Sequence, residues 1–308
     1  MAPPTDYPPR RSILDRPILI AIPILIGLFL TRSPFFMSAP ALDPAAAGSV
    51  AWADAPIKLV TTPQYETKKT DIFTTGATHM ALLHNAILRG YNSIFQQAPH
   101  IKPGDAADFV GYALTWHKFV ASHHDDEEMT LFPKVEAVLG NDTSVWAETH
   151  KEHEAFLGGL ARFEKYLRGT QDDGNVPATA LDGAELVRIM RSFQEPFGTH
   201  FHREVATIAA LADHPRAPAP GTPEAEQAAA TFKSWGKATV TKAGTLDVVP
   251  FFLLNLDGTA EDGMWANWPP MPAPVKWGLV NVAGAWHGRW WRFSSCAGGR
   301  PRKLYALE

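Results

Sequence analysis

Two histidines, two aspartates and two glutamates stand in a row in the segment HHDDEEMTLFP, residues 123–133. In a helix, side chains four positions apart lie on the same face. We therefore expect His123 beside Glu127, and His124 beside Glu128. An imidazole and a carboxylate on one helix face can bind a metal ion. Which of the two pairs faces the core decides which one has this role.

The apolar stripe of the surrounding helix separates the two pairs. At about 100° of rotation per residue, His123 and Glu127 lie inside this stripe, whereas His124 and Glu128 lie at its edge or beyond it. The apolar members of the stripe are Phe109, Tyr112, Ala113, Trp116, Phe119, Val120 and Leu131. A buried carboxylate is costly unless it is paired or bound to a metal. No lysine or arginine in the stripe can pair with Glu127, so the pattern predicts a metal ligand.

Three further helical segments each place a histidine on their apolar face. His84 lies in the stripe of the first segment. His153 lies in that of the third, with His150 about 60° away. In the fourth segment, His200 and Glu204 repeat the four-residue spacing of the second segment. A single core histidine is usually a hydrogen-bonded structural side chain, but a set with one histidine on every helix predicts a metal site.

These segments predict an all-α fold, an antiparallel up-down four-helix bundle with an N-terminal hydrophobic segment and a C-terminal extension. Short breaks rich in Gly, Pro and Asn favour antiparallel neighbours. The expected helices are 77–97, 104–139, 144–168 and 180–212. We assign the bundle domain to 71–213, preceded by a linker at 38–70 that is rich in Ala, Pro and Thr. The extension, 214–308, is expected to pack on the bundle.

The N-terminal segment, residues 1–37, combines arginines with an apolar run from Pro17 to Leu30. As a helix the run is about 21 Å long, against a hydrocarbon core of roughly 30 Å. This length suits a signal peptide, while apolar residues beyond it leave a membrane anchor open. We therefore predict a secretory-pathway or membrane-anchored localisation, with membrane association through this segment. A mitochondrial presequence is less favoured because Asp6 and Asp15 interrupt the basic stretch.

The composition limits the chemistry that the chain can support. Its 308 residues carry a net charge of −4, which gives no general attraction to nucleic acid, and we expect no nucleic-acid partner. Cys296 is the single cysteine, so a thiolate-rich metal site and an intrachain disulfide are both excluded. A metal must then be held by imidazole and carboxylate groups. This donor set suits iron, and it also accepts zinc or manganese.

The C-terminal extension is dense in tryptophan. Such residues, with arginines among them, can form a membrane-interface patch or a surface for a protein partner. More often they pack a tail onto its own domain, and we favour that interpretation. The residues concerned are Trp265, Trp268, Trp277, Trp286, Arg289, Trp290, Trp291 and Arg292.

Taken together, the four motifs resemble the hemerythrin-like, or HHE cation-binding, family. The chain is similar to its fungal members that carry a Trp-rich C-terminal extension. The resemblance covers about 77–212, and its motifs are LLHNAILRG, HHDDEEMTLFP, KEHEAFL and HFHREVATI. It implies a bundle that holds two iron ions. The implied ligands are His84 and His123 on one iron, His153 and His200 on the other, and Glu127 and Glu204 bridging both.

The resemblance leaves the role of His150 open. The oxygen-carrying members have a fifth histidine four residues before the counterpart of His153, and that position here is Thr149. His150 stands three residues before His153, on the side of the helix from which it could substitute. We include His150 in the predicted ligand set.

The family name does not fix one function. The resemblance implies a di-iron protein that binds or senses a small diatomic molecule, O2 or NO, or that handles iron. A di-iron oxidoreductase acting on NO or peroxide is an alternative, although the sequence has no flavin or nicotinamide motif to supply electrons. A structural or adaptor protein that uses the Trp-rich tail is a third possibility.

Overall fold

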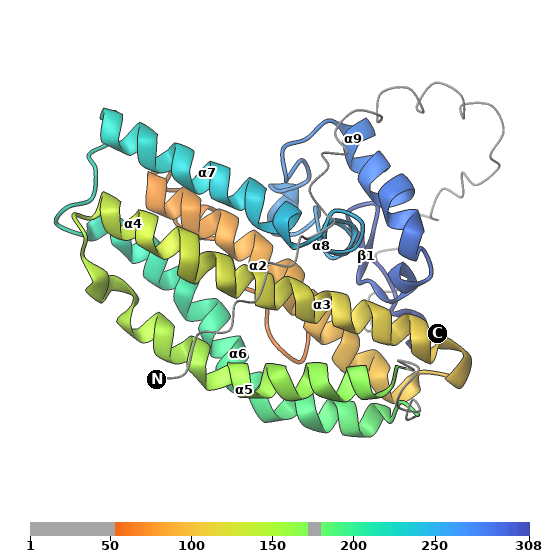
Figure 1. The fold of residues 1–308 in the computed structure, drawn as a ribbon. Coiled ribbons are helices and arrows are strands. Elements are labelled where there is room, and N and C mark those ends of the chain that lie inside the picture. Colours follow the sequence, from red (N-terminus) through yellow and green to blue (C-terminus); the bar gives the residue numbers. More distant parts are fainter. Residues whose placement is uncertain (1–52, 172–179) are drawn as a thin grey trace, which may run out of the picture. The chain divides into compact units, whose positions relative to one another are not determined.

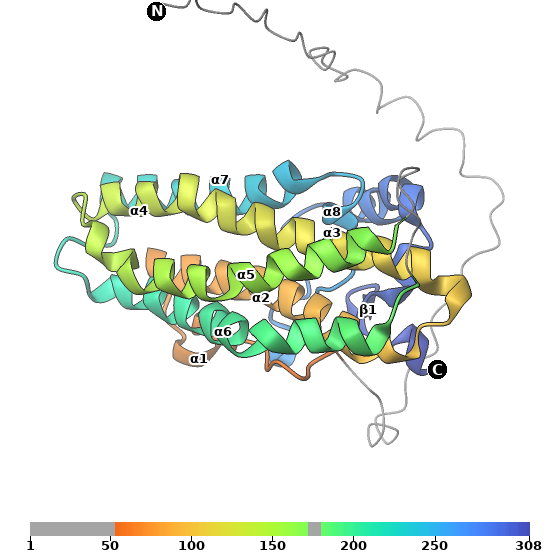
Figure 2. The same ribbon diagram turned by 60° about the horizontal axis from the view of Figure 1, so that its bottom comes forward.

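A computed structural model describes residues 53–171 and 180–308 of the chain. Its centre is a bundle in which consecutive long helices run antiparallel (Figures 1 and 2). The predicted all-α bundle is therefore confirmed. The bundle consists of α2 (Ile72–Gln97), α3 (Ala106–Asp126) continued by α4 (Phe132–Val138), α5 (Ala147–Gly169) and α6 (Gly183–Ala210).

Two of these helices begin at aspartates that cap their first backbone N–H groups. The Asp71 side chain accepts hydrogen bonds from the N–H groups of Phe73 and Thr74, and Asp182 caps α6 in the same way. Such caps satisfy donors that the first turn leaves unpaired. Helix α2 therefore begins five residues before the predicted position, because its first turn is set by the cap rather than by the apolar period.

A π-helical turn at Glu127–Leu131 interrupts the second long helix, which the sequence predicted as continuous. In this turn the Phe132 N–H donates to the Glu127 carbonyl oxygen, five residues back. Pro133 has no N–H to offer Met129, so the regular ladder cannot continue here. The extra residue in the turn brings Leu131 and Phe132 into the core together, while Met129 points to solvent.

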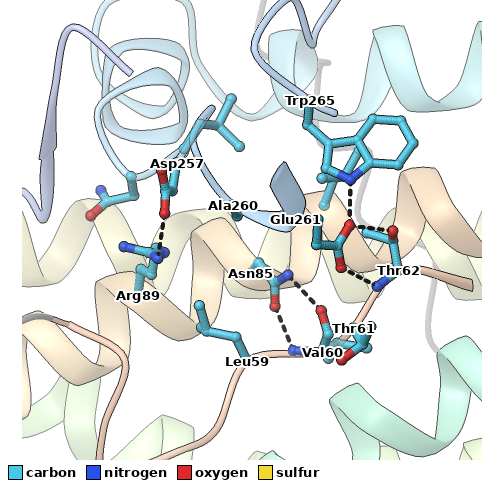
Figure 3. Close-up of a pocket in the computed structure, with 13 residues that line it drawn as sticks. Leu59, Val60, Thr61, Thr62, Asn85, Arg89, Asp257, Ala260, Glu261 and Trp265 are labelled. Carbon is cyan, nitrogen blue, oxygen red and sulfur yellow. Dashed lines mark hydrogen bonds and ion pairs between the residues drawn. The ribbon is translucent and has the colours of Figure 1, made fainter. Parts of the chain in front are cut away.

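The stretch 53–70, which was predicted as linker, packs against α2 and contains the short helix α1 (Pro63–Thr67). The Asn85 side chain accepts from the Val60 N–H and donates to the Val60 carbonyl oxygen, both at 2.8 Å. Glu261 accepts from the backbone N–H of Thr62 at 2.7 Å (Figure 3). These contacts border a cavity of about 200 Å³. The packing could not be predicted from the sequence, because few residues of this stretch are buried and they follow no regular period.

The C-terminal extension covers α2 and α3 with further helices. The Phe251 ring lies 4.9 Å from that of Tyr112, and the Phe293 ring lies 5.2 Å from that of Phe109. The extension therefore shares the core of the bundle. Its elements are α7 (Pro223–Ala243), α8 (Val248–Leu253), α9 (Ala273–Gly278) and the antiparallel pair β1 (Cys296–Ala297) and β2 (Arg300–Pro301).

The tryptophans of the extension divide into packed and exposed groups. Trp291 is buried, and its indole N–H donates to the Gly284 carbonyl oxygen. The Trp290 ring lies so close to Gly111 of α3 that a Cβ there would be 2.2 Å from it. Trp277 and Trp286 are 62% and 77% exposed. Packing onto the bundle thus accounts for part of the Trp-rich segment and leaves these two side chains at the surface.

The predicted localisation requires a correction. Residues 1–37, which carry the predicted signal or anchor segment, lie outside the described residues, as do 38–52 and 172–179. Among the helices that the structure describes, none combines the length and the apolar character needed to span a bilayer. The predicted secretory or membrane-anchored localisation is therefore not retained.

Candidate metal centre

The long helices of the bundle direct four histidine and two glutamate side chains into one layer of its core. Each of the six is at most 2% exposed. Their ligand atoms form two groups, and within each group these atoms lie within 4.8 Å of one another. The first group is His84, His123, Glu127 and Glu204, and the second is Glu127, His153 and His200.

In the first group, four donor atoms converge from α2, α3, the π turn and α6. Nε2 of His84 lies 3.1 Å from Nε2 of His123 and 3.2 Å from Oε2 of Glu204. Nε2 of His123 lies 2.9 Å from Oε1 of Glu127. Two imidazole nitrogens and two carboxylate oxygens therefore face a common point.

In the second group, α5 and α6 bring two more imidazoles close to the same carboxylates. Nε2 of His153 lies 3.8 Å from Oε2 of Glu127, and Nε2 of His200 lies 3.7 Å from Oε2 of Glu204. The two imidazole rings are 4.4 Å apart. Each glutamate thus lies between a histidine of one group and a histidine of the other.

Hydrogen bonds at the outer ring nitrogens set the tautomer of two of the histidines. Nδ1 of His84 donates to the Phe201 carbonyl oxygen at 2.9 Å, and Nδ1 of His153 donates to Oε1 of Glu128 at 2.6 Å. Burial lowers the pKa of His84, and it lowers the pKa of His153 to about 4, so both rings are neutral. In a neutral ring with a protonated Nδ1, Nε2 presents its lone pair.

The two buried glutamates lack the partners that a buried charge requires. Neither oxygen of Glu127 or of Glu204 has a hydrogen-bond partner among the described residues, although imidazole nitrogens lie 2.9 Å from Glu127 and 3.2 Å from Glu204. Burial raises the pKa of Glu127 well above its usual value, and the carboxylate of Glu204 raises it further. Burial also opposes ionisation of Glu204, but the surrounding imidazoles of His84, His200 and His153 together outweigh it and lower the pKa of Glu204. Metal cations would satisfy both carboxylates, so these residues fit a metal centre.

His150 does not join either group. Its side chain is 44% exposed, and Nδ1 donates to Oε1 of Glu128 at 3.0 Å. The three-residue offset from His153 places its ring at the edge of α5 rather than in the core. His124 lies at the same edge, with its ring 4.3 Å from that of His153. The structure therefore separates His150 from the other six predicted ligands and places it in contact with Glu128, which the sequence had set aside.

Aromatic rings line the histidines on several sides. The closest is Phe201, whose ring centroid lies 4.4 Å from that of His84. Trp235 of α7 packs against His123, so the C-terminal extension supplies part of this lining. This contact was not predicted from the sequence, because it depends on how α7 folds back over α3. The rings that pack against the histidines are Phe132, Phe156, Phe201 and Trp235.

The fold and the buried donor set together define a four-helix domain with a candidate cation site. Residues 75–212 match the family model described as the hemerythrin HHE cation binding domain.

One curated relative resembles most of the chain. It is the "Dimeric xanthone biosynthesis cluster protein R11" of Cryptosporiopsis sp. (strain 8999), which is 28% identical over 263 residues. These residues span 82% of this chain and 92% of that protein. The similarity therefore extends beyond the family domain into the flanking segments. No solved structure gave a match.

Proposed function

We propose that the chain is a non-haem di-iron protein that binds or senses O2 or NO, or handles iron. The observation that carries this proposal is the position of each buried glutamate between two histidines, with no hydrogen-bond partner in the described part of the chain. The proposed ligands are His84 and His123 for one ion, His153 and His200 for the other, and Glu127 and Glu204 for both.

The donor types favour iron over other metals. Imidazole with carboxylate suits iron, and the same set also accepts zinc or manganese. Six protein ligands are few for two ions, so an open coordination position remains for a ligand from solution. When bound there, ferrous iron supplies the capacity to bind a small diatomic molecule.

The surroundings of the centre favour a small ligand over a large organic one. Aromatic rings pack against the histidines and keep water away from them. Two cavities, of about 200 and about 480 Å³, lie elsewhere on the described part of the chain, and none of the six ligands lines them. These observations support access by O2 or NO.

Metal content and optical spectra test this proposal. The protein would be loaded with Fe²⁺ without oxygen, analysed for iron, exposed to O2 or NO, and then returned to inert gas. We expect about two iron ions per chain and an absorption change that reverses. Iron content below one per chain would contradict the proposal, and bound iron with no spectral response to either gas would contradict binding or sensing of O2 and NO and leave iron handling.

Two histidines of the same helix provide a matched control. His200→Ala should lower the iron content sharply, because this side chain is buried at the centre. His202 lies on another face of α6, where Nε2 contacts the Lys58 carbonyl oxygen at 2.9 Å. His202→Ala should therefore leave the iron content unchanged.

An oxidoreductase is the second candidate function. The relative named for a xanthone biosynthesis cluster shares both the family domain and flanking sequence with this chain. This likeness favours a catalytic role for a centre of the same kind, acting on NO or peroxide with an external reductant. Consumption of NO or peroxide that depends on added reductant, and that is lost in His200→Ala, would favour this candidate over simple binding.

A further inference from the structure

The two halves of the proposed centre differ at the outer nitrogens of their histidines. In the first half, Nδ1 of His84 donates to a neutral acceptor, the carbonyl oxygen of Phe201, at 2.9 Å. Nδ1 of His123 has no hydrogen-bond partner within 53–171 and 180–308. Neither imidazole of this half therefore contacts a negative charge through its outer nitrogen.

In the second half, a carboxylate stands behind each imidazole. Nδ1 of His153 donates to Oε1 of Glu128 at 2.6 Å. Nδ1 of His200 lies 3.5 Å from Oε2 of Glu152 but has no hydrogen-bond partner among the described residues. Hydrogen bonds to a carboxylate are shorter and stronger than those to a neutral acceptor. The contact between Glu128 and His153 is the stronger of the two and distinguishes this half from the other.

Glu128 is itself held in place from the solvent side. Oε1 also accepts from Nδ1 of His150 at 3.0 Å, so one carboxylate oxygen joins two imidazoles. The exposed fraction falls from 44% for the His150 side chain to 27% for Glu128 and 3% for His153. The three side chains form a hydrogen-bonded chain from the surface to a proposed ligand of the centre. The two imidazoles together hold the carboxylate of Glu128 in place.

We propose that Glu128 is a positioning residue that makes the His153–His200 position the tighter of the two metal positions. This inference rests on the proposed dimetal function. A carboxylate behind a ligating histidine fixes the tautomer and the orientation of the ring, and it makes the inner nitrogen a stronger donor. His150, which was predicted as a ligand, then acts by holding Glu128 toward His153.

Stepwise metal binding tests the proposal on the full chain. The metal-free protein would be titrated anaerobically with Fe²⁺ against a competing chelator of known affinity. We expect two binding steps. His153→Ala should remove the tight step and leave the weak one, whereas His84→Ala should remove the weak step and leave the tight one.

Substitutions of Glu128 then measure its contribution. Glu128→Gln keeps an oxygen that can accept from His153 but removes the charge, and Glu128→Ala removes both. Loss of an outer partner of a metal-bound histidine typically lowers metal affinity about 10- to 100-fold. We expect a loss in this range for the tight step, larger for Ala than for Gln. The weak step should change less than about threefold, and His150→Ala should weaken the tight step by less than either Glu128 variant.

Glu148→Gln is the matched control. Glu148 lies near the start of α5, two residues before His150, but it is 79% exposed and contacts Lys151 at 2.7 Å instead of a histidine. This variant should bind both ions as the wild type does. The melting temperature of each metal-free variant separates loss of affinity from loss of folding, and Glu128→Gln decides the matter if Glu128→Ala does not fold.

Two outcomes would count against different parts of the argument. Suppose that the wild type binds two ions, and that the Glu128 variants leave both steps unchanged or weaken them equally. The positioning role would then be wrong, while the dimetal function would stand. If the wild type binds no Fe²⁺, the proposed function itself fails.

Discussion

Helix α2 carries buried ionisable side chains on two of its faces. The charges on these two faces are compensated in different ways. On the inner face, His84 reaches Glu204, whose oxygens have no hydrogen-bond partner in the described part of the chain. On the outer face, the guanidinium of Arg89 is 2.9 Å from Asp54 and 3.1 Å from Asp257, and Figure 3 shows the second of these contacts. The first cluster has carboxylates without a cation, whereas in the second the cation is supplied by the protein.

The partner of a buried charged group distinguishes a structural ion pair from a site for a bound cation. Removing a charge from water is costly, so a buried ionic group is retained where a partner compensates it. Arg89 has that partner within the chain, and its cluster joins the bundle to the C-terminal extension. The glutamates of the inner cluster lack one, which is the pattern of a site that is completed by a bound cation. The following predictions test this contrast, beginning with the largest expected effect.

Replacing both inner glutamates should separate metal binding from folding. Glu127→Met combined with Glu204→Met removes the carboxylates while nearly preserving side-chain volume. We expect iron content to fall below about one-tenth of the wild-type value. The metal-free variant should be more stable than metal-free wild type by about 1–4 kcal/mol, because buried charge is replaced by apolar packing. Iron analysis and denaturant unfolding measure the two effects.

The direction of the stability change is the critical part of this prediction. Glu148→Met, at an exposed site on α5, controls for the substitution itself and should retain both ions. If the double variant were less stable than metal-free wild type, the glutamates would have a structural role in the empty bundle. The contrast with Arg89 would then be lost.

On the outer face, a substitution should lower stability and leave iron binding intact. Arg89→Met removes the partner of Asp257, whose side chain is only 10% exposed. Breaking a buried ion pair from one side costs about 3 kcal/mol or more, so denaturant unfolding should show a loss of this size. The folded fraction should still bind about two iron ions. Arg188→Met, at a side chain that is 72% exposed, should unfold as the wild type does.

Removal of the metal from the inner face should lower the stability of the protein, as Arg89→Met does on the outer face. A ligand that binds only the folded state at 100 times its dissociation constant stabilises that state by about 2.7 kcal/mol. Chelation should therefore lower the unfolding free energy of the loaded wild type by about this amount. The Glu127→Met and Glu204→Met double variant should not respond to the chelator, and a response of equal size would show that the effect does not come from the centre.

The repeated His-x3-Glu pattern made the inner cluster predictable from sequence. His123 with Glu127, and His200 with Glu204, lie inside long apolar stripes, and a helical stripe fixes which side chains face the core. The four-helix arrangement followed from the same stripes and from the short breaks between them. All four of these residues lie in the core.

Features that depend on contacts between distant segments could not be predicted in this way. Glu128 lies at the edge of its apolar stripe, and its proposed positioning role depends on contacts with His150 and His153 on a different helix. The π turn that begins at Glu127 is a local break linked to a proline, and apolar periodicity does not register it. Arg89 pairs with Asp257, which is 168 positions away along the chain.

The smallest expected effect concerns His79, which shares α2 with His84. They are five positions apart along the chain, so the two side chains point about 140° apart around the helix. His84 is fully buried at the centre, whereas His79 is partly buried beside Trp268, with ring centroids 6.3 Å apart. Its replacement by alanine removes this contact with the extension and no metal ligand. We expect His79→Ala to keep both ions and to lose less than about 1 kcal/mol of stability, in the usual range for a site outside the core. Iron analysis beside His84→Ala measures the difference, and equal loss of iron from the two variants would mean that the two faces of α2 are wrongly assigned.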